Sequence, residues 1–306
     1  MDVRHFLTVP DLSKAEFEAV LQQAAAWKKR PHGDILAGKT VALVFGKPST
    51  RTRVSFSVGV YQMGGMPLTL SEQEMQMRKS ESIEDTARVM SRFVDGLVIR
   101  TFAQKDVEDL AANASIPVIN ALTDENHPCQ ALADIFTFRE RFGDERGRKI
   151  VYLGDGNNVA ASLAEAGALA GIDVCLACPA GCDLPAEKME SIQALADANG
   201  TRVWVERDPE AAAAGASALY TDVWISMGQQ QDGAKVASLR PYQINSGLLA
   251  KARPDAIVLH CLPAHRGDEI TDEVMDGTQS AVFDEAENRL HAQKALMAFL
   301  IGGKLG

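Results

Sequence analysis

The chain lacks the features that mark membrane, secreted and nucleic-acid-binding proteins. Within its 306 residues, no stretch approaches the ~18 to 20 uninterrupted apolar residues of a membrane span. Its first residues, MDVRHFLTVPDLSKAEF, lack the basic-then-apolar layout of a secretion signal. A basic surplus is also missing, since the formal net charge is −10 and the pI is near 5.2. We therefore expect a cytoplasmic protein that binds neither membranes nor nucleic acids.

A disulfide framework and a clear metal-binding pattern are also missing. The five cysteines are an odd number, and their spacing matches no secreted disulfide scaffold. The segment CLACPAGC resembles a zinc ligand run, but Cys175 and Cys178 belong to an apolar strand pattern and no fourth ligand lies close in sequence. We expect buried structural thiols and no metal.

The sequence also lacks a complete dinucleotide-binding fingerprint. In LGDGNN, Gly154 and Gly156 match the first two glycines that follow a strand, but the third is missing. The next strand pattern, DVCLAC, ends without an acidic residue for a ribose, because Asp173 lies at its beginning. We therefore expect no nicotinamide cofactor. The two asparagines that follow, Asn157 and Asn158, are either helix caps or amides that recognise a small polar substrate.

The chain does contain a regular alternation of short apolar runs and amphipathic segments. A first helix is predicted where Ser13 and Glu16 form a capping box. Strand patterns follow in VALVF, MPLTL, GLVIR and IPVIN, and the rhythm restarts with KIVYLG, DVCLAC, RVWVE, ALYTD and AIVLHCLP. This alternation is typical of βαβ units around parallel sheets. The length, with 46% hydrophobic residues, allows more than one core.

We accordingly expect an α/β protein with two similar-sized domains, each a parallel sheet flanked by helices. The boundary lies in the charged segment near residues 136–149, so that the first domain covers residues 1–135 and the second covers residues 136–285. Residues 286–306 form a terminal helix ended by glycines.

The residues after several apolar runs are unusually polar, and in open parallel sheets ligands bind at the carboxyl ends of the strands. After VALVF, the segment from Ser49 to Arg53 places three hydroxyls and two guanidiniums at a predicted helix N-terminus. Free N–H groups, the helix dipole and guanidinium forks all favour a phosphate there. The alternative is an N-cap serine followed by an exposed basic turn.

Two other strand ends carry groups suited to acyl-transfer chemistry. His127 and Gln130 stand at a predicted helix start, where an imidazole and an amide N–H can polarise a carbonyl oxygen. The alternative is an ordinary loop histidine. Cys261 follows His260, but adjacent strand residues point to opposite faces, so we expect no catalytic dyad and a non-covalent role for the thiol.

Together these segments resemble the aspartate/ornithine carbamoyltransferase family. The motifs STRTR, HPCQALAD, GDGNN, DVWISMG, HCLPAHRG and ENRLHAQKALM occur in the family's order over nearly the whole chain. The resemblance implies carbamoyl transfer from carbamoyl phosphate to the side-chain amine of L-ornithine, in arginine metabolism. It also implies a homotrimer, an N-terminal carbamoyl-phosphate domain, a C-terminal ornithine domain and a last helix that returns to the first domain.

The resemblance also implies a role for each residue that matches the family's motifs. Arg100, His127 and Cys261 are expected to be catalytic. The expected carbamoyl-phosphate ligands are Ser49, Thr50, Arg51, Thr52, Gln76, Arg100, His127, Gln130, Cys261, Leu262 and Arg289. The expected ornithine ligands are Asn158, Asp222, Ser226 and Met227.

One departure and several alternatives remain open. After Gln76 the chain reads Met-Arg-Lys-Ser, where relatives often carry a glycine-bearing loop that reaches a neighbouring subunit's site. The amine acceptor could also be putrescine, an N-acylated ornithine or aspartate, although aspartate enzymes resemble HPLPR where this chain has HCLPA. A non-catalytic metabolite-binding relative is a further alternative.

Overall fold

The computed structural model describes residues 3–71, 75, 80–143, 146–225 and 232–303. The chain divides into two compact units of similar size. Unit 1 comprises residues 1–133 and 287–306, and unit 2 comprises residues 134–286. The closing helix α12 (Val282–Leu300) therefore begins in unit 2 and ends in unit 1, so the expected return of the last helix to the first domain is confirmed.

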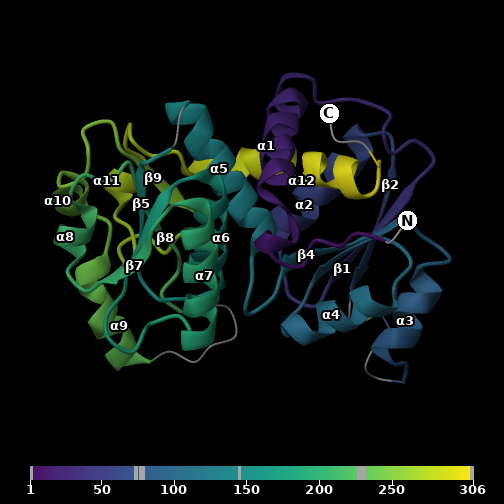
Figure 1. Cartoon of the computed structure of the whole chain (residues 1–306), viewed down its shortest axis with the longest axis horizontal. Helices are drawn as coiled ribbons and strands as arrows, with labels where there is room; N and C mark the ends of the chain where they lie inside the picture. The colour runs from purple at the N-terminus through teal and green to yellow at the C-terminus, as the bar shows by residue number, and fades with distance from the viewer. Residues whose placement is uncertain (1–2, 72–74, 76–79, 144–145, 226–231, 304–306) are drawn as a thin grey trace. The chain divides into compact units, whose positions relative to one another are not determined.

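The described part of unit 1 contains a four-stranded parallel sheet in the order β2-β1-β3-β4. The strands are β1 (Thr40–Phe45), β2 (Met66–Ser71), β3 (Gly96–Arg100) and β4 (Val118–Leu122). The helices are η1 (Val9–Asp11), α1 (Lys14–Lys29), α2 (Thr50–Gln62), α3 (Ile83–Met90), α4 (Gln104–Asn113) and the start of α5 (Pro128–Phe142). Figure 1 shows α1, α2 and α12 on one side of this sheet and α3 and α4 on the other.

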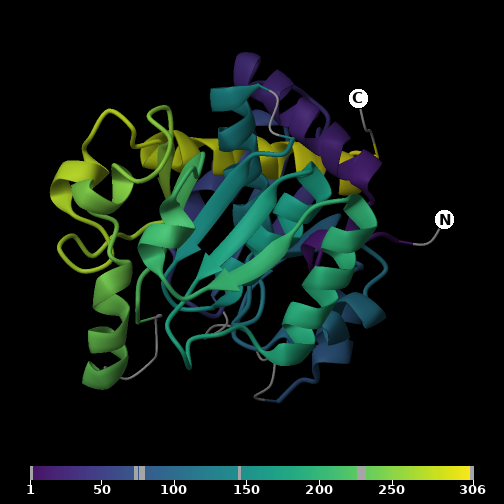
Figure 2. The same ribbon diagram turned by 60° about the vertical axis from the view of Figure 1, so that its left-hand side comes forward.

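The described part of unit 2 contains a five-stranded parallel sheet in the order β7-β6-β5-β8-β9. The strands are β5 (Lys149–Leu153), β6 (Asp173–Ala177), β7 (Val203–Glu206), β8 (Ala218–Thr221) and β9 (Ile257–His260). The other elements are α6 (Asn158–Ala170), α7 (Ala186–Asn199), α8 (Pro209–Ala213), α9 (Gly233–Leu239), η2 (Arg240–Tyr242), α10 (Ser246–Leu249) and α11 (Asp272–Met275). Figure 2 shows its strands running side by side.

Local sequence signals account for the helix starts. Ser13 accepts a hydrogen bond from the backbone N–H of Glu16, and Glu16 accepts one from the backbone N–H of Ser13, so the predicted capping box is confirmed. Ser82 likewise caps α3 by accepting from the backbone N–H of Asp85 at 3.0 Å. These caps fix where each helix begins after its preceding segment.

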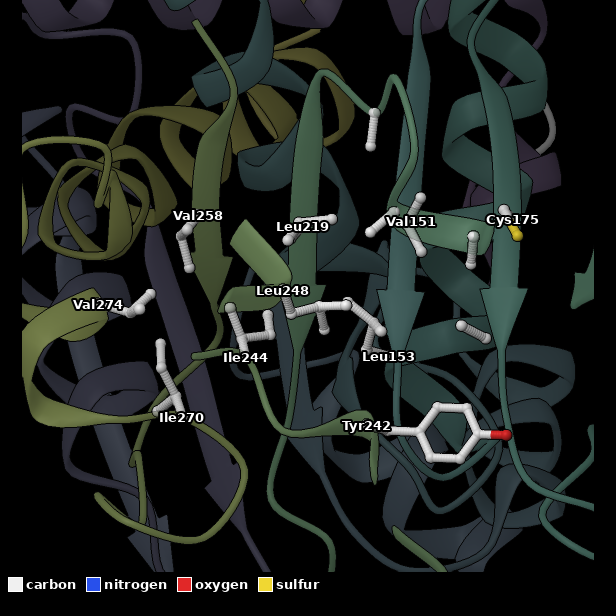
Figure 3. Packing of buried hydrophobic residues seen from close by; sticks show 14 of the residues in the cluster. Val151, Leu153, Cys175, Leu219, Tyr242, Ile244, Leu248, Val258, Ile270 and Val274 are labelled. Carbon is white, nitrogen blue, oxygen red and sulfur yellow. The ribbon is translucent and has the colours of Figure 1, made fainter. Parts of the chain in front are cut away.

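The buried face of the second sheet shows how the scaffold is held. Val151, Leu219 and Val258 come from three adjacent strands and pack against Ile244 and Leu248 in one cluster (Figure 3). Each such side chain is almost fully removed from water and contributes about 1.5–3 kcal/mol of burial free energy. This apolar layer makes the strands rigid supports for the polar residues at their carboxyl ends.

Both sheets contain a point at which the strand order reverses. In unit 1, β1 lies between β2 and β3, and in unit 2, β5 lies between β6 and β8. Chains that leave the sheet in opposite directions from such a point open a crevice at the carboxyl ends of the strands. Ligand-binding residues are therefore expected after β1 and β3 in unit 1, and after β5 and β8 in unit 2.

Candidate active site

The turn after β1 in unit 1 forms the start of α2. Ser49 is its N-cap, and its hydroxyl oxygen accepts from the backbone N–H of Thr52 at 3.3 Å. Thr50 and Arg51 occupy the first helical positions, where backbone N–H groups point out of the helix. The N-cap interpretation and the phosphate interpretation are therefore compatible, because the cap satisfies only one of the free donors.

The hydroxyl oxygen of Thr52 accepts hydrogen bonds from two guanidinium groups. Arg289 donates from Nη2 to Thr52 Oγ1 at 2.8 Å, and Arg100 donates from Nη1 to the same oxygen at 3.5 Å. All three residues are buried. β1 and β3 are neighbours in the sheet, with Phe45 paired to Arg100, so the register brings Arg100 beside the turn. The first half of α12 contributes Arg289 from far along the chain.

Lys47 and Arg51 both follow β1, but only the charge of Lys47 is neutralised by an ion pair with a described residue. Lys47 pairs with Asp124 and lies over the ring of Phe102, with 4.3 Å between Nζ and the ring centroid. Arg51 forms no ion pair with the residues that the structure describes, and its Nε is buried without a hydrogen-bond partner among them. The turn therefore holds a guanidinium that an anionic ligand can neutralise.

His127 lies within the field of the same guanidinium groups. Burial lowers the pKa of His127 well below its usual value, and positive charges lower that pKa further. The charges are those of Arg289, Arg100 and Arg51. The imidazole is therefore neutral at physiological pH and can donate a hydrogen bond from one ring nitrogen only. Gln130, in the first turn of α5, is also buried.

The corresponding edge of unit 2 has the opposite character. Thr221 at the end of β8 pairs with His260 at the end of β9, so the next residues, Asp222 and Cys261, meet. Cys261 donates from Sγ to Asp222 Oδ1 at 3.0 Å. Asn157, which caps α6, donates from Nδ2 to Asp222 Oδ2 at 2.9 Å. A buried carboxylate is thus held in a fixed orientation and keeps lone pairs for a ligand cation.

The Cys261 thiol is not prepared to act as a nucleophile. Burial raises its pKa well above the usual value, and the charge of Asp222 and the hydrogen bond to it raise that pKa further. The thiol is therefore protonated and serves as a hydrogen-bond donor. This geometry supports the non-covalent role expected from the sequence.

Our expectation that the side chains of His260 and Cys261 point to opposite faces of a strand was wrong. β9 ends at His260, so strict strand alternation stops before Cys261. Ligand-type atoms of Asp222, His260 and Cys261 lie within 4.8 Å of one another, which is also a spacing compatible with a metal site. The imidazole is nevertheless engaged elsewhere, because Nε2 lies 3.1 Å from Glu269 Oε1 and Nδ1 accepts from the backbone N–H of Leu262 at 2.9 Å.

The turn that follows is backbone-strained. Leu262 has a φ of 60°, and among the described residues it is the one non-glycine with a positive φ. Left-handed geometry costs a leucine roughly 1–2 kcal/mol. The hydrogen bond from its N–H to His260 stabilises this conformation, and such strain is concentrated at functional sites. His260 and Glu269 lie nine residues apart, so no local sequence pattern indicated this support.

A second buried hydrogen-bond network, centred on Glu285, holds the end of β9. Glu285 accepts from the backbone N–H of His260 at 2.8 Å and from the hydroxyl of Tyr220 at 3.3 Å. Burial and the adjacent carboxyl of Asp134 raise the pKa of Glu285 well above its usual value. Neither this network nor the Asn157–Asp222 bond was predicted from the sequence. The capping position of Asn157 directly after a strand was the available signal.

The local backbone explains why glycine occupies both positions in LGDGNN. Gly154 has a φ of 140°, which other residues rarely adopt. A side chain at Gly156 would approach the carbonyl oxygen of Cys182 to 2.6 Å, because the chain after β6 packs against it. Close backbone packing therefore explains the motif without a nucleotide.

The predicted site residues divide between the two units. Unit 1 holds Ser49, Thr50, Arg51, Thr52, Arg100, His127, Gln130 and Arg289, and unit 2 holds Asn158, Asp222, Cys261 and Leu262. The described contacts join Arg100 and Arg289 to Thr52, and Cys261 to Asp222. Asn158 is the first residue of α6. Gln76, Ser226 and Met227 lie outside the described residues.

Family models match both halves of the chain. The carbamoyl-P binding domain of aspartate/ornithine carbamoyltransferase matches residues 4–140, and the Asp/Orn binding domain matches residues 146–300. The chain belongs to the aspartate/ornithine carbamoyltransferase family. No described helix is long and apolar enough to cross a membrane.

Several members of this family are similar to the chain over almost its full length. Ornithine carbamoyltransferase from Rhodococcus opacus is 50% identical, with 99% of this chain and 98% of the relative aligned. The structure of ornithine carbamoyltransferase from Pyrococcus furiosus is 46% identical with a TM-score of 0.94, covering 98% of both chains. That from Gloeobacter violaceus is 48% identical with a TM-score of 0.89, covering 97% of this chain and 98% of the other.

Proposed function

We propose that this chain is an enzyme that transfers the carbamoyl group of carbamoyl phosphate to the side-chain amine of L-ornithine, giving L-citrulline and phosphate. The observation that carries the proposal is the group of guanidiniums around Thr52 and His127, in a chain half identical to ornithine carbamoyltransferases. Such a group at a helix N-terminus suits a phosphate dianion.

In the proposed reaction, unit 1 binds the carbamoyl donor. The N–H groups and hydroxyls of the first turn of α2 hold the phosphate, together with Arg51 and Arg100. Arg289, neutral His127 and Gln130 surround the carbamoyl end and stabilise the negative charge that develops on its oxygen. The same charges make the phosphate a better leaving group.

Unit 2 is proposed to bind the amino acid. The carboxylate of Asp222 is buried and oriented by Asn157 and Cys261, which suits the α-ammonium of ornithine. The neutral side-chain amine attacks the carbamoyl carbon, a C–N bond forms and the C–O bond to phosphate breaks. The proton released by the amine leaves with phosphate as the products separate. The cytoplasmic location and the roles of Gln76, Asn158, Ser226 and Met227 stay predictions.

A panel of acceptors tests the proposal. The purified chain, given carbamoyl phosphate and one amine at a time, is expected to form citrulline from ornithine with the largest kcat/KM. Putrescine lacks the α-ammonium that Asp222 would bind, N-acetylornithine has it blocked, and the side chain of aspartate carries a carboxylate in place of an amine. A larger kcat/KM for any of these three would identify a different carbamoyltransferase, and no turnover with any would leave a non-catalytic binding protein.

We also propose that the chain forms a homotrimer. One face of α2 exposes Val54, Val58 and Tyr61, which keep 53%, 37% and 71% of their accessible surface and have helical spacing. An exposed apolar stripe of this kind marks an interaction surface. Tyr61→Glu is expected to reduce the mass measured in solution from that of three chains towards that of one. Phe283→Glu, at an exposed phenylalanine of unit 2, is the control.

A further inference from the structure

A buried chain of amide and hydroxyl groups in unit 1 leads to His127. It begins at Asn120 in β4, passes through Gln104 at the start of α4, and ends at Thr123 and Asn126 in the turn before α5. All of these side chains are buried. None of them belongs to the set of substrate ligands proposed above.

The hydrogen bonds among Asn120, Gln104 and Thr123 have directions that follow from the contact of Asn120 with Leu7. The carbonyl oxygen of Leu7 accepts from Asn120 Nδ2 at 2.8 Å, which fixes the orientation of that amide. The same Nδ2 donates to Gln104 Oε1 at 3.3 Å, so Gln104 presents its oxygen here. Because Gln104 Oε1 can only accept, the Thr123 hydroxyl is the donor in their 2.7 Å contact, which is shorter than its 3.4 Å contact with the carbonyl oxygen of Asn126.

The oxygen of the Thr123 hydroxyl holds the turn that precedes His127. Because the Thr123 hydroxyl proton is used by Gln104, its oxygen accepts from the backbone N–H of Asn126 at 3.1 Å. The backbone N–H of Thr123 donates to the carbonyl oxygen of Asn126 at 2.9 Å, which closes the turn. His127 comes next, and its carbonyl oxygen accepts the first hydrogen bonds of α5.

Among the described residues, the backbone hydrogen bonds that join the segment after β3 to the segment after β4 stop at residue 124. The backbone N–H of Thr101 bonds to Leu122, and that of Asp124 bonds to Phe102, so the segments after β3 and β4 are joined up to residue 124. The bridge between Gln104 and Thr123 extends that connection to Asn126. It thereby links the segment after Arg100 to the segment before His127.

The network is costly for stability, which argues for another purpose. Gln104 Nε2 and Asn120 Oδ1 are buried without hydrogen-bond partners among the described residues. Buried polar groups left unsatisfied destabilise a fold, and apolar side chains of the same size would avoid that cost. A fixed hydrogen-bond direction is what the polar groups supply in return.

We infer that Gln104, acting through the hydroxyl of Thr123, is a positioning residue that places the imidazole of His127 for carbamoyl transfer. This inference rests on the proposed function, in which His127 stabilises charge on the carbamoyl oxygen. A displacement of about 1 Å at such a group is enough to slow an enzyme on the order of 100-fold.

Removing either end of the bridge tests the inference. Gln104→Leu keeps the size of the side chain but removes the acceptor, and Thr123→Val removes only the hydroxyl. Each is expected to lower kcat about 10- to 100-fold with less than about a 3-fold change in the ornithine KM. Thr123→Ser, which keeps the hydroxyl, is expected to retain near wild-type kcat. If Gln104→Leu does not fold, Thr123→Val and Thr123→Ser carry the test.

The control separates positioning from general destabilisation. Thr86 is also a buried threonine of unit 1, and its hydroxyl donates to the carbonyl oxygen of Ser82 at 2.9 Å in α3. Thr86→Val is expected to lower the melting temperature about as much as Thr123→Val does, without lowering kcat. Equal losses of kcat in these two variants would overturn the inference.

A double-mutant cycle with His127 decides which claim fails. In a His127→Ala background, Gln104→Leu is expected to have no further effect on kcat, because the group that it positions is gone. If His127→Ala is slow and Gln104→Leu slows it again by the same factor, the inference is wrong and the proposed function stands. If His127→Ala turns over at the wild-type rate, the proposed role of His127 is wrong and the inference falls with it.

Discussion

The two units build the same kind of site with charges of opposite sign. Each is an open parallel sheet with polar residues after the strands at a reversal of strand order. Unit 1 gathers the guanidiniums of Arg51, Arg100 and Arg289 near a neutral imidazole. Unit 2 gathers a buried carboxylate, a protonated thiol and an amide. The side chains at the strand ends, and not the topology, therefore decide whether such a site suits an anion or an ammonium group.

The largest expected loss of activity comes from replacing Arg51, one of the cations of unit 1. Arg51→Ala is expected to lower kcat/KM by at least ~100-fold, about 2.7 kcal/mol of transition-state stabilisation, because the proposed contact of this guanidinium with the dianion is lost. Arg53 is the matched control in the same turn, since it is exposed and lies over the ring of Phe45 at 5.1 Å. Arg53→Ala is expected to change kcat/KM by less than about 3-fold. Similar losses in both variants would indicate only a general electrostatic effect.

The pH dependence tests which groups are already neutral. The side-chain amine of ornithine has a pKa near ~10.4 and must be deprotonated to react, so kcat/KM for ornithine is expected to rise about 10-fold per pH unit from pH 7 to pH 9. Because the pKa of His127 lies well below its usual value, no further proton leaves it in this range. A rate that falls as pH rises through 6 to 7 would show that a protonated His127 is needed.

The thiol of unit 2 gives a smaller expected effect. Cys261→Ser keeps a donor to Asp222 Oδ1, and the raised pKa of Cys261 keeps the thiol protonated in the wild type. We therefore expect kcat to fall less than about 10-fold. Cys261→Ala, which loses the donor, is expected to be slower than Cys261→Ser. A covalent intermediate trapped on Cys261, or a loss of activity with serine as complete as with alanine, would contradict a non-covalent role.

The smallest expected effect is on stability, at another buried cation of unit 1. Lys294 is fully buried, and its ammonium donates to the carbonyl oxygen of Pro31 at 3.0 Å and to Gln62 Oε1 at 2.8 Å. Burial lowers the pKa of Lys294 to about 8, from an ordinary value of 10.5. Between these values the unfolded chain binds a proton that the folded chain does not, so this group makes stability rise with pH.

Urea unfolding at pH 8, 9 and 10 measures that contribution. The rise in the free energy of unfolding is expected to be larger in the wild type than in Lys294→Met, which removes the titrating group. Lys188 is the control, because its ammonium pairs with the carboxylate of Glu165 in unit 2. Lys188→Met is expected to keep the wild-type slope. Identical slopes in wild type and Lys294→Met would show that the buried ammonium has no depressed pKa.

Local signals predicted the elements, and long-range register determined the rest. β1 was predictable because the apolar run VALVF lies within it, and α1 was predictable because the Ser13–Glu16 capping box marks its start. The contact between Asp222 and Cys261 joins residues 39 apart and depends on the pairing of Thr221 with His260. Nothing local encodes that pairing. The orientation of Cys261 relative to His260 was mispredicted for a related reason, because the sequence does not show that β9 ends at His260.

The division of labour between the units is tested most directly by the two Michaelis constants of two variants. The KM for carbamoyl phosphate and the KM for ornithine should be measured in Arg51→Ala and in Asp222→Asn. The account predicts a crossed result, in which Arg51→Ala raises chiefly the first and Asp222→Asn raises chiefly the second, each by at least about 10-fold, or 1.4 kcal/mol. If Asp222→Asn instead raised the KM for carbamoyl phosphate more than that for ornithine, the assignment of the two substrates to the two units would be wrong.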